Sequence, residues 1–166
     1  MKKTSGFDAK RLAYAAVCIA FSMVLSYIES LLPVWIPVPG VKLGLANIAV
    51  VFLLYRSTWG DALCVSLLRV GLSALLFGSF VSLLYSASGA LFSFFAMLFV
   101  KKSGRFSVIG VSVVGGVMHN VGQTVAACFV LSGTALLYYL PVLLIFGVLS
   151  GVLIGVLAGL VFRRVK

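Results

Sequence analysis

The chain has 166 residues, of which 63% are hydrophobic and 10% charged, and its mean hydropathy is +1.24. Because water-soluble domains carry about 25% charged residues, this composition excludes a soluble globular protein. The formal net charge is +10, but the basic residues stand in short groups at the borders of apolar segments, without the interleaved aromatic residues of a nucleic-acid surface. We therefore exclude nucleic acid as a partner and expect the lipid bilayer to be the surroundings.

Six apolar segments follow one another, separated by glycine, proline and charged residues. They predict an all-α bundle of six transmembrane helices that forms a single domain over residues 1–166, with spans at about 11–31, 43–55, 59–78, 80–100, 107–132 and 135–162. The second segment is short for a full crossing of roughly 20 residues. Pro33, Pro37 and Pro39 precede it and prevent a regular helix there.

The basic residues predict the orientation of the bundle. If both termini lie on one side, that side holds all of the 13 basic residues except Lys42 and Arg69. Cytoplasmic loops carry an excess of Lys and Arg, so the pattern predicts a multi-pass protein of the cell inner (cytoplasmic) membrane with both termini in the cytoplasm. Lys42 would then lie at the outer start of the second span, and Arg69 near the middle of the third.

Small residues recur every four positions in the first and last spans. The last span contains Gly147, Gly151, Gly155 and Gly159, and the first contains Ala16 and Ala20. Such stripes let membrane helices approach closely. Two interpretations stay open: the stripes pack inside the bundle, or they dock onto another membrane subunit.

Several polar residues interrupt the apolar spans. An ionisable group inside a span costs at least ~2.5 kcal/mol on insertion scales, so it indicates a partner, a water-filled cavity or a function. Arg69 is such a group. In the fifth span, His119, Asn120 and Gln123 share one narrow arc of the helix with two glycines. Those glycines, Gly115 and Gly116, would leave space for a bound ring or for another backbone.

These groups predict a ligand site in the outer half of the bundle. Its candidate substrate-binding residues are Glu29, Lys42, Asn47, Arg69, His119, Asn120 and Gln123. Asp61, at the inner start of the third span, is interpreted instead as a helix N-terminal residue stabilised by the helix dipole. Motifs for phosphate loops, serine nucleophiles, zinc or diphosphate binding do not occur, so we expect no catalytic residue, no metal and no cofactor.

Two strings resemble a known family. Residues 39–48 read PGVKLGLANI and residues 119–123 read HNVGQ; together with Asp61, Arg69 and the region 86–89 they resemble the Gx transporter family, also labelled heptaprenyl diphosphate synthase component I. That family is similar in architecture to the S components of energy-coupling factor (ECF) transporters. The resemblance implies six helices, an external loop matched by residues 33–42, and docking of an Ala16 and Ala20 face onto a transmembrane coupling subunit that works with cytoplasmic ATPases.

The leading hypothesis is an S component that captures a small vitamin-, flavin- or quinone/prenyl-precursor-like molecule from outside. Arg69 and Lys42 would contact the ligand if it is anionic. The alternative is an accessory membrane subunit of a prenyl-diphosphate/quinone or electron-transfer system. Prenyl elongation needs clustered aspartates that hold magnesium and diphosphate, whereas this chain has three acidic residues in all, so we expect no synthase activity.

Overall fold

The computed structural model describes residues 9–31, 44–130 and 135–164, and all regular secondary structure in this part of the chain is helical. The elements are α1 (Ala9–Leu31), α2 (Asn47–Arg56), α3 (Trp59–Phe77), α4 (Phe80–Lys102), α5 (Val108–Val130), the 3-10 turn η1 (Ala135–Tyr139) and α6 (Leu140–Arg164). The predicted all-α membrane bundle is confirmed. Lys42 and the proline-rich segment before it lie outside the described residues.

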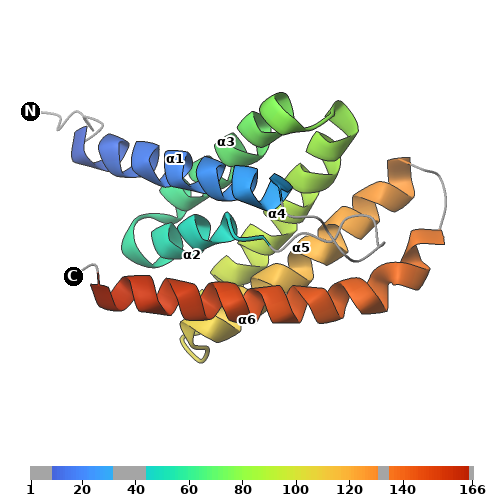
Figure 1. Cartoon of the computed structure of the whole chain (residues 1–166). Helices are drawn as coiled ribbons and strands as arrows, with labels where there is room; N and C mark the ends of the chain where they lie inside the picture. The colour runs from blue at the N-terminus through green and yellow to red at the C-terminus, as the bar shows by residue number, and fades with distance from the viewer. Residues whose placement is uncertain (1–8, 32–43, 131–134, 165–166) are drawn as a thin grey trace, which may run out of the picture.

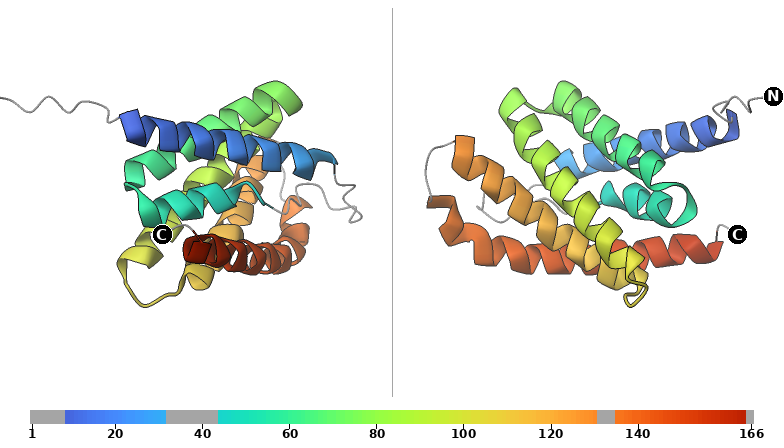
Figure 2. Two further views of the ribbon diagram at one scale, coloured as in Figure 1. Left: turned by 60° about the vertical axis from the view of Figure 1, so that its left-hand side comes forward. Right: turned by 180° about the vertical axis from the view of Figure 1, so that it is seen from behind.

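The helices form two groups, which meet where α3 packs against α4 and through the short α2 (Figure 1). Helices α4, α5 and α6 are antiparallel neighbours, while α1 and α3 lie together on the other side. The short α2 packs against α1, α3 and α6. The start of α1 and the end of α6 lie at the same end of the bundle, and the two further views agree (Figure 2). We call this end, which also holds the α2–α3 turn, the termini end.

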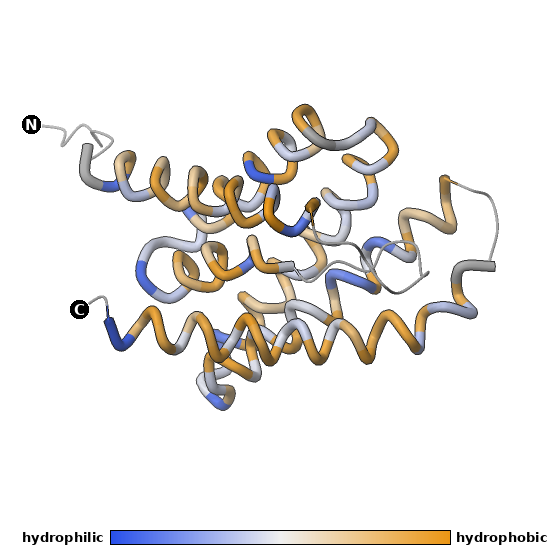
Figure 3. Tube along the Cα trace, in the orientation of Figure 1, coloured by the Kyte–Doolittle hydropathy of each residue, from blue (hydrophilic) through white to orange (hydrophobic). Residues whose placement is uncertain are grey.

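Five helices are long and apolar enough to cross a membrane: α1, α3, α4, α5 and η1 with α6. Apolar residues cover most of their length, and hydrophilic positions concentrate at the ends of helices and at a few interior points (Figure 3). Large apolar side chains are exposed on the outside, such as Leu75 and Phe129, each 82% exposed. Such a surface fits lipid and not water. The protein is therefore a multi-pass membrane protein.

Helix α2 differs from the other five. It has ten residues, so at 1.5 Å per residue it is about 15 Å long, roughly half of the hydrocarbon core. Every residue from Ile48 to Leu54 is buried. The second predicted span is thus a half-length helix inside the protein. Its start follows a turn at Gly44, whose φ of 69° is a left-handed conformation that glycine adopts without strain.

The termini end is fixed by polar contacts between helices. Thr58 and Asp61 form a capping box at the start of α3, as the position of Asp61 predicts. The Asp61 carboxylate also forms an ion pair with Arg11 of α1, at 2.9 Å. Near the C-terminus of α2, Lys101 of α4 donates a hydrogen bond to the Leu54 carbonyl, where a positive charge complements the helix dipole.

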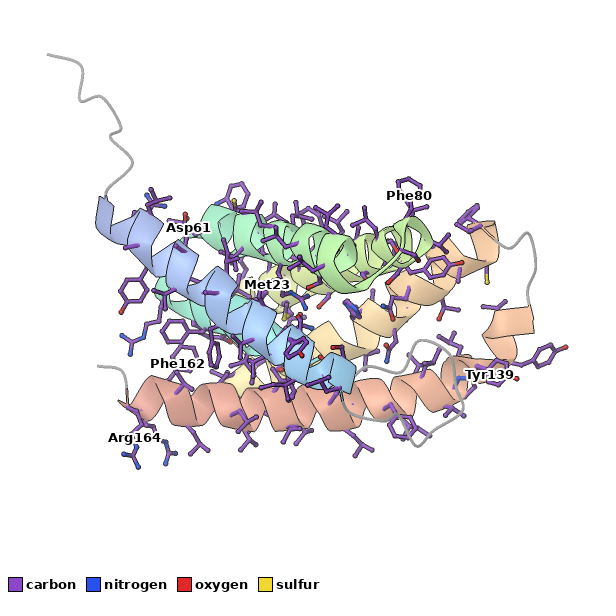
Figure 4. All side chains as sticks on the ribbon, turned by 45° about the horizontal axis from the view of Figure 1, so that its top comes forward. Met23, Asp61, Phe80, Tyr139, Phe162 and Arg164 are labelled. Carbon is purple, nitrogen blue, oxygen red and sulfur yellow. The ribbon has the colours of Figure 1, made fainter. Side chains whose placement is uncertain are left out.

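Aromatic side chains complete this end of the bundle. Phe162 of α6 stacks on Phe52 of α2 with the ring centroids 5.5 Å apart. Figure 4 places Asp61, Phe162 and Arg164 toward the termini end and Phe80 and Tyr139 toward the opposite end. The C-terminal half of α2 is therefore anchored, and its N-terminal end points into the bundle.

Candidate functional site

The glycines of α6 lie against the backbone of α5. A Cβ added at Gly151 would lie 2.6 Å from the Cα of Val113, and one added at Gly155 would lie 2.6 Å from the Cα of Ile109. Gly147 faces Gly116 in the same way, but nothing lies within 4 Å of a Cβ added at Gly159. Three of the four glycines in the α6 stripe thus line an internal helix contact.

The space expected beside Gly115 and Gly116 is occupied by the protein itself. A Cβ at Gly115 would collide with the side chain of Met97 of α4, and one at Gly116 would collide with the carbonyl of Gly147. The two glycines therefore serve two different neighbours, α4 and α6. Of the two uses expected for this space, the structure shows the approach of another backbone at Gly116.

The polar residues of α5 divide in the same way. The buried Asn120 donates a hydrogen bond from Nδ2 to the Leu143 carbonyl of α6, at 2.5 Å. Toward α4, a Cβ at Gly89 would lie 2.7 Å from Cγ of Gln123 and 3.1 Å from Cε1 of His119. Asn120 thus helps to hold α6, whereas His119 and Gln123 pack over a glycine of α4.

A second polar group joins α1, α2 and α3, and we call it the Arg69 cluster. Its members are Glu29, Gly44, Asn47 and Arg69. Nη2 of Arg69 donates to Oδ1 of Asn47, at 3.0 Å. The backbone N–H of Gly44 donates to Oε1 of Glu29, at 2.6 Å, and the Gly44 carbonyl accepts from the Asn47 N–H, at 2.8 Å. The contacts form one chain from the end of α1 to the middle of α3.

The local structure explains why these side chains meet. Glu29 lies in the last turn of α1, and Asn47 is the first residue of α2. Because α2 is half-length, its first residue lies deep enough to reach Arg69, the eleventh of the 19 residues of α3.

The hydrogen-bonding capacity of Arg69 is only partly used. A guanidinium has five N–H donors, and the Nε of Arg69 is buried without a hydrogen-bond partner among the described residues. The Glu29 carboxylate is near enough to interact electrostatically with Arg69, yet within the described ranges the two side chains form no direct ion pair. Chemically, such a group can bind a carboxylate, a phosphate or a carbonyl oxygen.

The structure therefore brings Glu29, Asn47 and Arg69 together and places His119 and Gln123 on another helix pair. Sequence reasoning missed the part played by Gly44, whose N–H holds Glu29. A glycine three residues before the first residue of a helix was the available signal. In the part of the chain that the structure describes, no group of three or more His, Cys, Asp or Glu residues can hold a metal ion.

Comparison with known proteins identifies the fold. The chain is similar to a solved structure described as "Structure and mechanism of the S component of a bacterial ECF transporter", with a TM-score of 0.63 and 20% sequence identity over 94% of this chain and 95% of that chain. The helical arrangement is thus that of an S component. The family model described as heptaprenyl diphosphate synthase component I matches residues 18–161, so the chain belongs to that family. No curated protein matches the chain. Both resemblances inferred from the sequence are confirmed.

Proposed function

We propose that this protein is the substrate-binding S component of an ECF-type importer. It captures a small vitamin-, flavin- or quinone/prenyl-precursor-like molecule from outside the cell. The observation that carries the proposal is the Arg69 cluster: a charged group whose buried Nε is unpartnered among the described residues, set in the apolar helices of an S-component fold. An ionisable group inside a membrane span is by default a candidate functional residue.

The proposed orientation places the termini end in the cytoplasm. Arg11, Arg56, Lys101 and the basic residues at the end of α6 belong to that half of the bundle, where an excess of positive charge is expected on the cytoplasmic side. The N-terminal end of α2, with Asn47, then points away from the cytoplasm. A ligand that arrives from outside meets the Arg69 cluster first.

The ligand contacts that we propose come from both polar groups. Glu29, Asn47 and Arg69 supply the charged side, and His119 and Gln123 of α5 supply a polar wall. Asn120 bonds to α6 instead, so we do not place it among the ligand contacts. Lys42 stays a predicted contact.

The proposed partner of the S component is a transmembrane coupling subunit with cytoplasmic ATPases. Ala16 and Ala20 are exposed on the outer face of α1, where small side chains let another helix approach closely. We propose that the protein binds a substrate and catalyses no reaction, although its family is named after a synthase.

Purification of the tagged full-length chain from its native membrane in mild detergent tests the proposal. We expect a transmembrane coupling subunit and ATPases to copurify. Ala16→Leu and Ala20→Leu should remove these partners, whereas Cys64→Leu, at an exposed position of α3, should keep them. Copurification with a prenyltransferase or a redox partner, without an ATPase, would favour the accessory-subunit alternative.

A further inference from the structure

The Arg69 guanidinium holds more donor capacity than the described residues use. Its Nη2 donates to Asn47, and its Nε is buried without a partner among those residues. A buried donor left unsatisfied costs free energy, and a charged donor costs more than a neutral one. The arrangement is therefore incomplete as a purely structural tie.

The acidic neighbour of Arg69 does not complete it. Oε1 of Glu29 accepts the Gly44 N–H at 2.6 Å, and within the described ranges this carboxylate forms no direct ion pair with Arg69. Its interaction with Arg69 is electrostatic and at longer range. A charge-assisted hydrogen bond to the guanidinium is thus left for another acceptor.

We infer that the cargo carries an oxyanion, a carboxylate or a phosphate, and that Arg69 binds it. The guanidinium fork matches the paired oxygens of both groups. Asn47 is a positioning residue, because its Oδ1 holds one arm of the fork. Glu29 is a positioning residue too, because it holds the turn from which Asn47 projects. This inference rests on the proposed function for the identity of the ligand as cargo.

The apolar surroundings strengthen such a contact. Val65, one turn before Arg69 on α3, is fully buried, and Gly44 lies close to Ile154 of α6. Charge-assisted bonds in a water-poor site are stronger than those in water. A neutral carbonyl would leave the guanidinium charge without a counter-ion at contact distance, so the oxyanion is the better fit.

Thermal unfolding of the purified full-length chain, with added oxyanions at constant ionic strength, tests the inference. The probes are acetate, inorganic phosphate and pyrophosphate, with chloride as the reference salt. At least one oxyanion should raise Tm in a saturable way. Arg69→Gln should raise the half-saturation concentration roughly tenfold or more. Arg105→Gln, which removes the same charge from an exposed turn, should leave it unchanged.

Asn47→Asp separates ligand binding from a structural role. This variant puts a carboxylate at the place where Oδ1 of Asn47 already lies 3.0 Å from Nη2 of Arg69. It should raise Tm in chloride and abolish the response to the oxyanion, because the built-in carboxylate occupies the fork. If Arg69 had only a structural role, Asn47→Asp would still raise Tm, but the Tm of the wild type would not respond to oxyanions.

Mass spectrometry of the small molecule that copurifies with the wild type provides a test that needs no variant to fold. An anionic molecule supports the inference. A bound molecule without an oxyanion, or the absence of any saturable shift in the wild type, overturns it. The proposed function fails separately, if no coupling subunit or ATPase associates, so the two failures can be told apart.

Discussion

The α5–α6 contact and the Arg69 cluster both place polar groups inside apolar helices. They differ in how fully those groups are hydrogen-bonded within the protein. In the α5–α6 contact, the Asn120 amide bonds to the Leu143 carbonyl, and glycines bring the two backbones together. In the Arg69 cluster, a guanidinium keeps a buried Nε without a partner among the described residues. The first arrangement is typical of helix association in membranes. The second leaves a donor free for a ligand.

This difference teaches how to interpret a polar residue inside a membrane span. His119, Asn120 and Gln123 form the more conspicuous pattern in the sequence, but part of it is used in packing. Arg69 is a single residue, but its guanidinium keeps N–H donors that neither Asn47 nor Glu29 binds. The short α2 matters here because its first residue, Asn47, contacts Arg69.

The largest expected effect on stability is at the α5–α6 contact. Gly151→Ala introduces a Cβ 2.6 Å from the Cα of Val113, so the two backbones must separate. We expect a loss of about 3 kcal/mol in the free energy of unfolding, measured by denaturation in detergent. Gly159→Ala is the matched control on the same stripe, and its open surroundings predict no loss. Equal effects at both positions would mean that the contact is not tight.

Asn120→Ala is expected to cost about 1–2 kcal/mol of stability, because it removes an interhelical hydrogen bond and leaves a small void. It should leave the half-saturation concentration of the stabilising oxyanion within about twofold of the wild-type value, since the amide points to α6. Parallel unfolding and ligand titration check both parts. A strong loss of binding without a loss of stability would indicate that Asn120 contacts the ligand.

Two variants of Glu29 distinguish the effect of its charge on the Arg69 cluster from the effect of its hydrogen bond to Gly44. Glu29→Gln keeps an acceptor for the Gly44 N–H and removes the negative charge near Arg69. We therefore expect about threefold tighter oxyanion binding, with little change in stability. Glu29→Ala also removes the acceptor, so it should cost about 1 kcal/mol of stability. Calorimetry of both variants with the same oxyanion measures the difference, and weaker binding by Glu29→Gln would contradict the assigned role.

The smallest effect is expected at the termini end. Arg11→Gln breaks the ion pair with Asp61, which is partly exposed, so it should cost no more than about 1 kcal/mol. The loss should shrink as salt is added. Thermal unfolding at two salt concentrations checks this, and a loss as large as that of Gly151→Ala would show that the termini end, too, is tightly coupled.

The helices could largely be predicted from the sequence, because apolar length is a local property. The small-residue spacing indicated a close helix contact but did not say whether the neighbour was inside the bundle or on another subunit. The short second segment was also visible in the sequence. The start of α2 at Asn47 was not, because it follows a turn at the left-handed Gly44 and depends on contacts with other helices. The division of the α5 polar face between α4 and α6 was also beyond the sequence, since periodicity places Gly115 and Gly116 on one arc but does not say which neighbour each one meets.

The central claim is that the Arg69 cluster holds the ligand and that the α5–α6 contact holds the fold. Mass spectrometry of the small molecule bound to the wild type, Arg69→Met and Asn120→Ala tests it most directly. The account predicts bound ligand in the wild type and in Asn120→Ala, and none in Arg69→Met, with the helical fold of each variant checked by circular dichroism. Ligand retained by Arg69→Met, or lost from a folded Asn120→Ala, would contradict the account.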